Sequence, residues 1–186
     1  IIGIGSGTLN DLCKFCSHKM KVDYFIVATA PSMDGYASDV APLIVNNLKT
    51  TYEKVGRPKV ILGDTDILKD APLRMVTAGA GDIFGKYICL TDWQLAHIVN
   101  GEYYCPFIAD IMKEAVTAVA KAADHGIAER DPKAIGAVME ALVLAGVGMS
   151  YSGNSRPASG SEHHMSHYWE MKFLQRGEHG ILHGTK

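Results

Sequence analysis

Hydrophobic positions in the first seventy residues predict short buried strands that alternate with a helix and turns. Residues 1–5 are apolar residues and glycines, a pattern typical of a strand that enters a glycine-rich turn. Apolar positions at helical spacing follow at Leu12, Phe15 and Cys16, and the runs at 23–30 and 59–62 predict two further strands. Because two or three short strands do not form a covered sheet, we expect the chain to be a fragment of a larger protein, truncated at both ends.

The remaining apolar positions repeat at helical spacing. This spacing predicts helices over residues 83–100 and 104–123. Asp131-Pro132 is typical of a helix start with proline at the first position, and we expect that helix to continue through residues 134–149.

The order of these segments predicts the fold class. A loop rich in glycine, serine and asparagine at 150–161 precedes a histidine-dense segment, and residues 180–184 have the pattern of another helix start. We therefore expect an incomplete Rossmann-like, nucleotide-binding α/β part over residues 1–70, followed by an all-α part over residues 71–186.

The composition is that of a folded globular protein. The 186 residues are 47% hydrophobic and 20% charged, and the net charge of -2 comes without a long run of one sign, so we expect no nucleic-acid partner. The longest apolar run, at 134–149, is shorter than the roughly 20 residues of a bilayer span, so we expect no membrane span. Four cysteines fit no secreted disulfide framework, and no signal peptide is visible at the N-terminus, which indicates a cytoplasmic location.

Cys13 and Cys16 form a C-x-x-C pair, which occurs in redox and zinc motifs. At helical spacing both thiols lie on one face of the expected helix. Because no second C-x-x-C completes a zinc site, we interpret the two cysteines as small packing groups.

The glycine turn Gly3-Ile4-Gly5-Ser6-Gly7 lies between an expected strand and an expected helix. Free backbone N–H groups and a helix N-terminus at such a place can bind a pyrophosphate. The third glycine spacing of the Rossmann fingerprint is missing, however. An ordinary tight connection and a nucleotide site therefore remain equally open on these residues alone.

Histidine density is the strongest chemical signal, because five of the eight histidines lie between residues 163 and 183. His163 and His167 are four apart and share a helical face, which allows both imidazoles to bind one metal ion. His164 and His167 are three apart and offer a second register, and a polar surface face explains the pattern without a metal. His179 or His183, which lie after a glycine-containing turn, can bring a further imidazole to the same metal ion.

Two aspartates are candidate partners of these histidines. A divalent metal bound by neutral imidazoles is better balanced by a carboxylate, and Asp82 follows two glycines at an expected helix start. The alternative for Asp82 is an N-cap. For Asp34, an ordinary Asp-Gly turn with Gly35 is the favoured interpretation from the residues alone.

Taken together, these segments resemble the sn-glycerol-1-phosphate dehydrogenase family, a branch of the group that contains dehydroquinate synthase, glycerol dehydrogenase and the iron-dependent alcohol dehydrogenases. The strings specific to this branch are TAPSMDGYAS at 29–38 and SRPASGSEHH at 155–164. Three further strings agree with the family in order: GSGTLNDLCK at 5–14, AGAGDI at 78–83 and LHG at 182–184. The resemblance implies a dehydroquinate synthase-like fold that continues beyond both ends of this chain.

The resemblance also implies roles for single residues. It places Asp82, His163 and His183 as the ligands of one divalent metal, which favours His163 over His164. It places Asp34, Asp82 and His167 at the substrate, with His167 and Asp82 taking part in catalysis. The positions that it assigns to NAD or NADP are Gly7, Thr8, Leu9, Asn10, Asp11, Thr29, Ala30, Pro31, Ser32 and Ser38.

The implied activity is a metal-dependent, NAD(P)-linked oxidation of sn-glycerol 1-phosphate, running in the cell as reduction of dihydroxyacetone phosphate. The substrate is then a small phosphorylated three-carbon compound, and a homo-oligomer is possible. Zinc, nickel and iron all suit two imidazoles and a carboxylate, and the choice between NAD and NADP stays open. A glycerol dehydrogenase, a dehydroquinate synthase-like enzyme and a non-catalytic homologue that binds metal or nucleotide are the alternatives.

Overall fold

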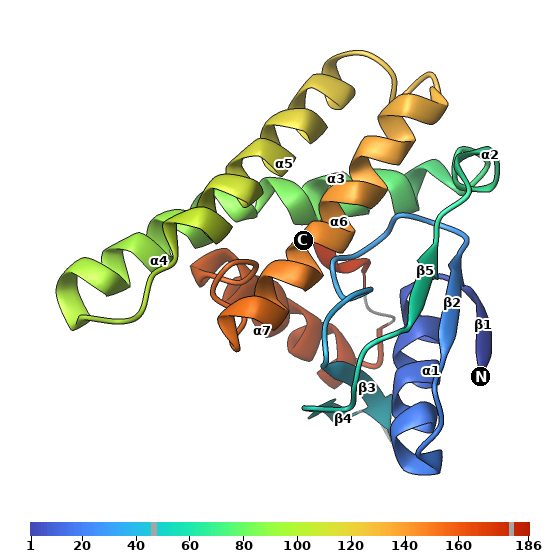
Figure 1. Cartoon of the computed structure of the whole chain (residues 1–186), viewed down its shortest axis with the longest axis horizontal. Coiled ribbons are helices and arrows are strands. Elements are labelled where there is room, and N and C mark those ends of the chain that lie inside the picture. Colours follow the sequence, from blue (N-terminus) through green and yellow to red (C-terminus); the bar gives the residue numbers. More distant parts are fainter. Residues whose placement is uncertain (46–47, 179–180) are drawn as a thin grey trace.

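The computed structural model describes residues 1–45, 48–178 and 181–186. A parallel sheet of three strands lies at one side of the molecule in the order β1-β2-β5, formed by β1 (Ile2–Gly5), β2 (Phe25–Ala28) and β5 (Val60–Leu62) (Figure 1). Helix α1 (Gly7–Met20) connects β1 to β2. The three strands and this helix confirm the expected elements of the α/β part.

The parallel sheet is covered by helix on one face only. Gly3 and Gly5 let α1 pack closely, since a Cβ atom on Gly3 would lie 2.6 Å from the sulfur of Cys13. On the opposite face the apolar side chains of Ile2, Phe25 and Val60 are paired in register across the three strands and are exposed. An apolar sheet face of this kind normally packs against further elements.

An antiparallel hairpin was not expected from the sequence. It consists of β3 (Ala41–Val45) and β4 (Leu48–Tyr52), and it extends away from the parallel sheet beside α1 (Figure 1). The ring of Tyr52 packs on Phe15 of α1 at a centroid distance of 4.6 Å. The strand sequences APLIV and LKTTY lack a regular alternation of apolar and polar residues. The two-residue period that predicts a strand is therefore absent from the hairpin.

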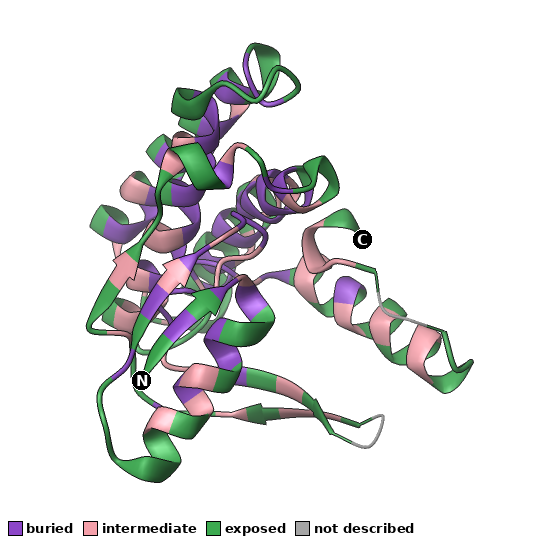
Figure 2. Ribbon diagram, turned by 90° about the vertical axis from the view of Figure 1, so that its right-hand side faces the viewer, coloured by how far each residue is buried: buried purple, intermediate pink, exposed green. Residues whose placement is uncertain are grey.

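The rest of the chain is helical, as expected. Its elements are α2 (Thr65–Leu68), α3 (Leu73–Phe84), α4 (Lys86–Asn100), α5 (Pro106–Asp124), α6 (Pro132–Ser152), α7 (Ser161–Gln175) and the 3-10 turn η1 (His183–Thr185). Helices α3, α5 and α6 pack against one another around a core that contains Met112, Ile135 and Leu142. Helix α7 lies to one side and buries only Ser166 (Figure 2).

Two boundaries differ from expectation. The helix expected over residues 83–100 is divided at Gly85, so residues 83 and 84 belong to α3 and a new helix begins at Lys86. Near residue 180 the expected helix is only the three-residue turn η1, and residues 179 and 180 lie outside the described residues. The division of the chain near residue 70 stays a prediction.

Helix α6 is longer than its apolar run suggested. Its 21 residues are long and apolar enough to cross a membrane by length and composition, so the expectation that the segment is too short was wrong. Half of the apolar window is buried inside the protein, where α6 packs on α3 and α5. A core helix of this kind satisfies the same criterion as a membrane span.

The cysteine pair behaves only in part as expected. Cys13 is half-buried beneath the sheet, in agreement with a packing role, whereas Cys16 is exposed. Both thiols are free.

The loop over residues 31–40 follows β2 and is largely buried, although it has no regular secondary structure. Lys14 of α1 holds it: its ammonium, with a side chain that is 0% exposed, donates hydrogen bonds to the carbonyls of Gly35 at 2.9 Å and Val40 at 2.7 Å. Lys14 also donates to the hydroxyl of Ser38 at 3.2 Å and lies 3.4 Å from a carboxylate oxygen of Asp11. A single buried cation therefore satisfies backbone acceptors that no strand or helix pairs.

Replacing Lys14 by Met should destabilise the full-length protein by about 3 to 5 kcal/mol, because it leaves the Asp11 carboxylate and the loop carbonyls buried without a donor. Urea unfolding measures the loss, and limited proteolysis should detect cleavage within residues 31–40. Lys19→Met, at an exposed position on the same helix, is the matched control and should change stability by no more than about 0.5 kcal/mol. Equal stability of the two variants would contradict this role for Lys14.

Candidate metal and substrate site

The expected cofactor segments lie side by side at the carboxyl ends of β1 and β2. The amide of Thr29 donates to the carbonyl of Gly5 at 3.1 Å, which joins the glycine turn to the start of the loop. In open α/β sheets this edge is where ligands bind. Ser6 occupies the N-cap of α1 without a side-chain hydrogen bond, so the free N–H groups of the helix start are available to an anion.

Several of the expected cofactor residues are engaged inside the protein. Asn10 donates to the carbonyl of Gly35 at 3.3 Å and, like Asp11, Ala30 and Ser38, is buried. Burial raises the pKa of Asp11 to about 6, against the opposing effect of Lys14. The more accessible members of the set are Thr8, Leu9 and Thr29. The remaining three, Gly7, Pro31 and Ser32, are buried, and their contact with a coenzyme, as for the whole set, stays a prediction.

Asp82 lies in the last turn of α3, so the expectation that it begins a helix was wrong, and it is no N-cap. Its carboxylate accepts a hydrogen bond from the backbone amide of Asp34 at 3.0 Å through Oδ2, and one from Lys86 at 3.0 Å through Oδ1. The Asp82 side chain is 3% exposed. Burial and the neighbouring Asp34 raise the pKa of Asp82 to about 6, against the opposing effect of Lys86.

Asp34 is more than an ordinary Asp-Gly turn residue. Its Oδ2 lies 2.6 Å from the ammonium of Lys86, which also donates to the carbonyl of Ala158 at 2.9 Å. Burial raises the pKa of the Asp34 carboxyl, but Lys86 outweighs this effect and holds the pKa below its ordinary value. The carboxylates of Asp34 and Asp82 raise the pKa of Lys86, which is therefore charged at neutral pH.

Three of the candidate histidines form one cluster. The ring centroids of His163 and His167 are 4.5 Å apart, those of His163 and His183 are 4.3 Å apart, and those of His167 and His183 are 5.2 Å apart. His164 is exposed and is not part of this cluster, whereas His179 lies outside the described residues. The structure thus places His163 and His167 side by side, as the first of the two expected registers predicts, and His183 lies next to both.

Two imidazole nitrogens of this cluster converge. His163 Nδ1 and His183 Nε2 are 3.0 Å apart, and His183 Nδ1 lies 3.2 Å from the hydroxyl of Ser166. Burial lowers the pKa of His163 to about 3 and that of His183 to about 4. Both rings are therefore neutral at physiological pH, which is the form that binds a metal.

The side chains of Asp82, His163 and His183 suit a divalent metal, although they are not arranged as a complete coordination site. Two imidazole nitrogens bound to zinc at about 2.0 to 2.1 Å in a tetrahedral site lie roughly 3.4 Å apart, close to the separation of His163 and His183. The turn that carries His183 packs directly on α3, because a Cβ on Gly184 would lie 2.5 Å from the backbone nitrogen of Asp82. Within residues 1–45, 48–178 and 181–186, no three ligand side chains converge as they stand.

A second charged group adjoins the histidines and was not expected. Lys49 of β4 lies 2.8 Å from His167 Nδ1 and 2.6 Å from Glu170 Oε2. The ammonium of Lys186 lies 3.6 Å from the same Glu170 oxygen. The hairpin therefore brings a lysine to α7 across more than one hundred residues of sequence.

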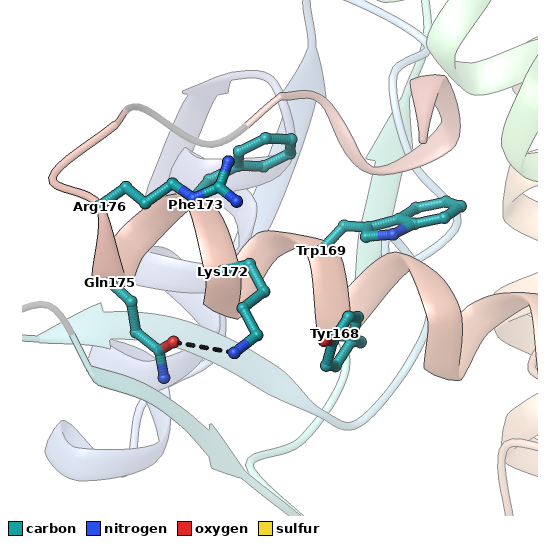
Figure 3. Close-up of a pocket in the computed structure, with 6 residues that line it drawn as sticks. All are labelled: Tyr168, Trp169, Lys172, Phe173, Gln175 and Arg176. Carbon is teal, nitrogen blue, oxygen red and sulfur yellow. Dashed lines mark hydrogen bonds between the residues drawn. The ribbon is translucent and has the colours of Figure 1, made fainter.

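One surface hollow lies away from these residues. Its volume is about 450 Å³, and it is lined by residues at the outer end of α7, among them Trp169, Lys172 and Arg176 (Figure 3). None of the aspartates or histidines described above lines it. This hollow is therefore separate from the candidate site.

The lysines were the functional residues that sequence reasoning missed. Asp11 and Lys14 are three apart and Asp82 and Lys86 are four apart, which is the spacing of ion pairs on a helix. That spacing is common on exposed helix faces, and only their position among apolar residues distinguishes these two pairs. Lys49 and Lys186 had no comparable signal, because their partners lie far away in the sequence.

Glu170 should contribute stability at neutral pH that disappears in acid. Contact with His167 and Lys49 lowers the pKa of its carboxyl well below the ordinary value of 4.5, so folding favours the charged form. The contribution is then complete above pH 4.5 and is lost as the pH falls below it. In full-length protein, Glu170→Gln should lower the free energy of unfolding by about 1 to 2 kcal/mol at pH 7, and by progressively less as the pH falls from 4.5 towards the folded-state pKa.

Urea unfolding over this pH range tests the expectation for Glu170. Glu178→Gln, which changes an exposed glutamate beyond the end of α7, is the control and should have no effect at any pH in this range. A pH-independent loss in Glu170→Gln would show that packing, not charge, accounts for the effect.

Comparison with known proteins gives consistent results. Residues 1–72 match the family model described as iron-containing alcohol dehydrogenase. Over its whole length the chain is 43% identical to a glycerol-1-phosphate dehydrogenase (NAD(P)+) of Geobacillus thermodenitrificans, of which it covers 45%. It is 42% identical to the enzyme of the same name from Halalkalibacterium halodurans, of which it covers 46%. The chain thus spans about half the length of the curated relatives it matches.

Solved structures agree at the level of the fold. A probable glycerol dehydrogenase from Sinorhizobium meliloti 1021 superposes with a TM-score of 0.77 at 19% identity, covering 98% of this chain and 52% of that one. This likeness confirms the expected dehydroquinate synthase-like fold of an α/β part followed by helices. In sequence, residues 1–72 resemble the iron-containing alcohol dehydrogenase family, and the whole chain is similar to glycerol-1-phosphate dehydrogenases.

Proposed function

We propose that the protein from which this chain comes is a metal-dependent, NAD(P)-linked dehydrogenase that interconverts sn-glycerol 1-phosphate and dihydroxyacetone phosphate, and that it reduces the ketone in the cell. The observation that supports this most directly is the 43% identity to a glycerol-1-phosphate dehydrogenase along the entire chain. The histidine cluster beside two buried aspartates is the chemistry that such a reaction needs. Glycerol dehydrogenase neighbours share the fold at about 20% identity, which does not favour their substrate over the phosphorylated one.

In this proposal Asp82, His163 and His183 hold one divalent metal, which when bound acts as a Lewis acid on the substrate oxygen. Zinc, nickel and iron all suit these donors. A hydrogen bond from His183 Nδ1 to the Ser166 hydroxyl would leave Nε2 free as the donor atom. Asp34 contacts the substrate, and Lys86 fixes its carboxylate through Oδ2 so that the other oxygen stays available.

His167 handles the substrate proton. Nδ1 of His167 lies 2.8 Å from the Lys49 ammonium and 3.5 Å from Glu170 Oε2. In the tautomer that accepts a hydrogen bond from Lys49, the ring carries its proton on Nε2. An imidazole N–H of this kind can supply a proton to the oxygen of the reduced ketone and can hydrogen-bond the alcohol in the reverse direction.

NAD or NADP would bind across the glycine turn and the start of the 31–40 loop, with its pyrophosphate at the N-terminus of α1. We further propose a soluble cytoplasmic enzyme without a nucleic-acid partner, and a homo-oligomer is compatible with the exposed sheet face. Only the small phosphorylated substrate and the coenzyme are required partners.

The activity itself is the first test. Full-length, metal-loaded protein should oxidise NADH or NADPH when dihydroxyacetone phosphate is added, and the product should be the sn-1 enantiomer of glycerol phosphate. Free dihydroxyacetone should react much more slowly. Equal rates with phosphorylated and free substrate would instead identify a glycerol dehydrogenase, and no turnover with a metal-replete protein would favour a non-catalytic homologue.

Variants of three histidines test the metal assignment in the full-length protein. His163→Ala should abolish metal retention and turnover together, because a ligand is lost. His167→Ala should retain the metal while lowering kcat, and His164→Ala, at an exposed position, should keep near-stoichiometric metal and most of the activity. Elemental analysis and steady-state rates decide the matter. Metal loss in His164→Ala beside full retention in His163→Ala would move the ligand by one residue.

A further inference from the structure

Two lysines from distant parts of the sequence meet at one carboxylate beside the histidine cluster. Lys49 reaches it from the β3–β4 hairpin and Lys186 from the end of η1, and both ammonium groups approach the same oxygen, Glu170 Oε2. Lys49 also contacts His167, whose ring lies against His163 and His183. We call Lys49, Lys186 and Glu170 the lysine cluster.

The lysine cluster has more positive than negative charge. Two ammonium groups share one carboxylate, and the three imidazoles nearby add no negative charge. Glu170 lies 2.6 Å from Lys49 but 3.6 Å from Lys186, a distance too long for a hydrogen bond. The nearest anion is therefore already committed to Lys49.

Lys186 makes no hydrogen bond among the described residues, although it is withdrawn from solvent and lies 3.6 Å from Glu170. Its side chain is 2% exposed, and its ammonium nitrogen has no hydrogen-bond partner among the described residues. A buried ammonium normally pairs with an anion, because the loss of hydration must be compensated. An additional anion at this point would give Lys186 the hydrogen bond that Glu170 does not provide.

We propose that Lys49 and Lys186 bind the phosphate group of the substrate. The inference rests on the proposed function and extends it by naming the phosphate site. In dihydroxyacetone phosphate three bonds separate the carbonyl carbon from phosphorus, so a substrate whose carbonyl lies at the histidines places its phosphate one side chain away. His167 occupies that intermediate position, in contact with Lys49 on one side and with His163 on the other.

The arrangement gives the hairpin a function in selectivity. β4 carries Lys49 to α7, and the other lysine follows directly on the turn that carries His183. Glu170 holds Lys49 in place and limits the excess charge, so that a dianion is bound more strongly than a neutral hydroxyl group. Discrimination between phosphorylated and free substrates is then a property of the lysine cluster, and the imidazoles act on both.

The readout is the specificity ratio, defined as kcat/KM for dihydroxyacetone phosphate divided by kcat/KM for dihydroxyacetone, in full-length metal-loaded enzyme. Lys186→Met and Lys49→Met should each lower this ratio at least tenfold, since each removes one charged hydrogen-bond donor to phosphate. Lys49→Met should in addition lower kcat for both substrates, because Lys49 orients His167. A change in folding or in His167 alone would affect both substrates equally and leave the ratio unchanged, which would overturn the proposal.

Two control variants accompany these. Lys186→Arg keeps the charge and should preserve most of the ratio. Lys172→Met removes an exposed lysine of α7 that lies near Gln175 and the Tyr168 ring, and it should leave the ratio unchanged (Figure 3). A decrease in Lys172→Met equal to that in Lys186→Met would mean that general surface charge, not the lysine cluster, attracts the substrate.

The coenzyme is a second source of phosphate, and kinetics separates the two. If the lysine cluster binds the substrate, its variants change KM for dihydroxyacetone phosphate and leave KM for NADH and NADPH unaltered. A change confined to the coenzyme KM would overturn the proposal. Inorganic phosphate should also inhibit the wild-type enzyme competitively against dihydroxyacetone phosphate, and at least tenfold more weakly in Lys186→Met.

Failure of the proposed function is distinguishable from failure of this inference. If the wild-type protein reduces no triose, binding of inorganic phosphate can still be measured by titration calorimetry on the metal-loaded protein. Binding that is lost in Lys186→Met and kept in Lys172→Met supports the anion site even then. Binding that is absent from the wild type, or equal in both variants, overturns it.

Discussion

The Lys86 ammonium connects three parts of the site that are distant in sequence. It joins the loop after β2 through Asp34, helix α3 through Asp82, and the segment before α7 through the carbonyl of Ala158. The side chain is 1% exposed, so its charge depends on the carboxylates that face it. Because Asp34 and Asp82 bind the same ammonium, their relative positions are coupled. The α/β part and the helical part are thus fixed to each other where the chemistry is expected.

Close backbone approach is the second constraint. A Cβ atom on Gly79 would lie 2.0 Å from the carbonyl oxygen of Pro31, and one on Gly81 would lie 2.1 Å from that of Gly184. Glycine at these positions lets α3 touch both the 31–40 loop and the turn that carries His183. The glycines around Asp82 therefore allow close backbone approach, but they do so inside α3 and not at the helix start that was expected there.

Much of the architecture was predictable because it depends on local periodicity. The strands at 1–5, 23–30 and 59–62 and the long helices have clear periods, and the spacing of His163 and His167 on one helical face follows from the same geometry. The hairpin was missed because its strands do not alternate, and Asp82 was misplaced because Gly85 separates two helices that have one continuous apolar pattern. The resemblance to a family, and not the spacing, favoured Asp34 as more than a turn residue. Buried lysines such as Lys14 were invisible in the pattern, since a lysine in an expected helix is normally solvated.

The buried cations explain why the loop that carries Asp34 needs no regular secondary structure. Lys14 satisfies its carbonyls from one side, and Lys86 binds its carboxylate from the other. The loop is therefore held by two lysine ammonium groups and not by backbone hydrogen bonds of a strand or helix. Its remaining polar groups can then face a ligand at the carboxyl ends of the strands. A divalent cation bound by Asp82 would add positive charge beside Lys86, and Asp34 would then be the carboxylate that balances the ammonium. Asp34 would then be required for charge balance in the site as well as for the proposed contact with substrate.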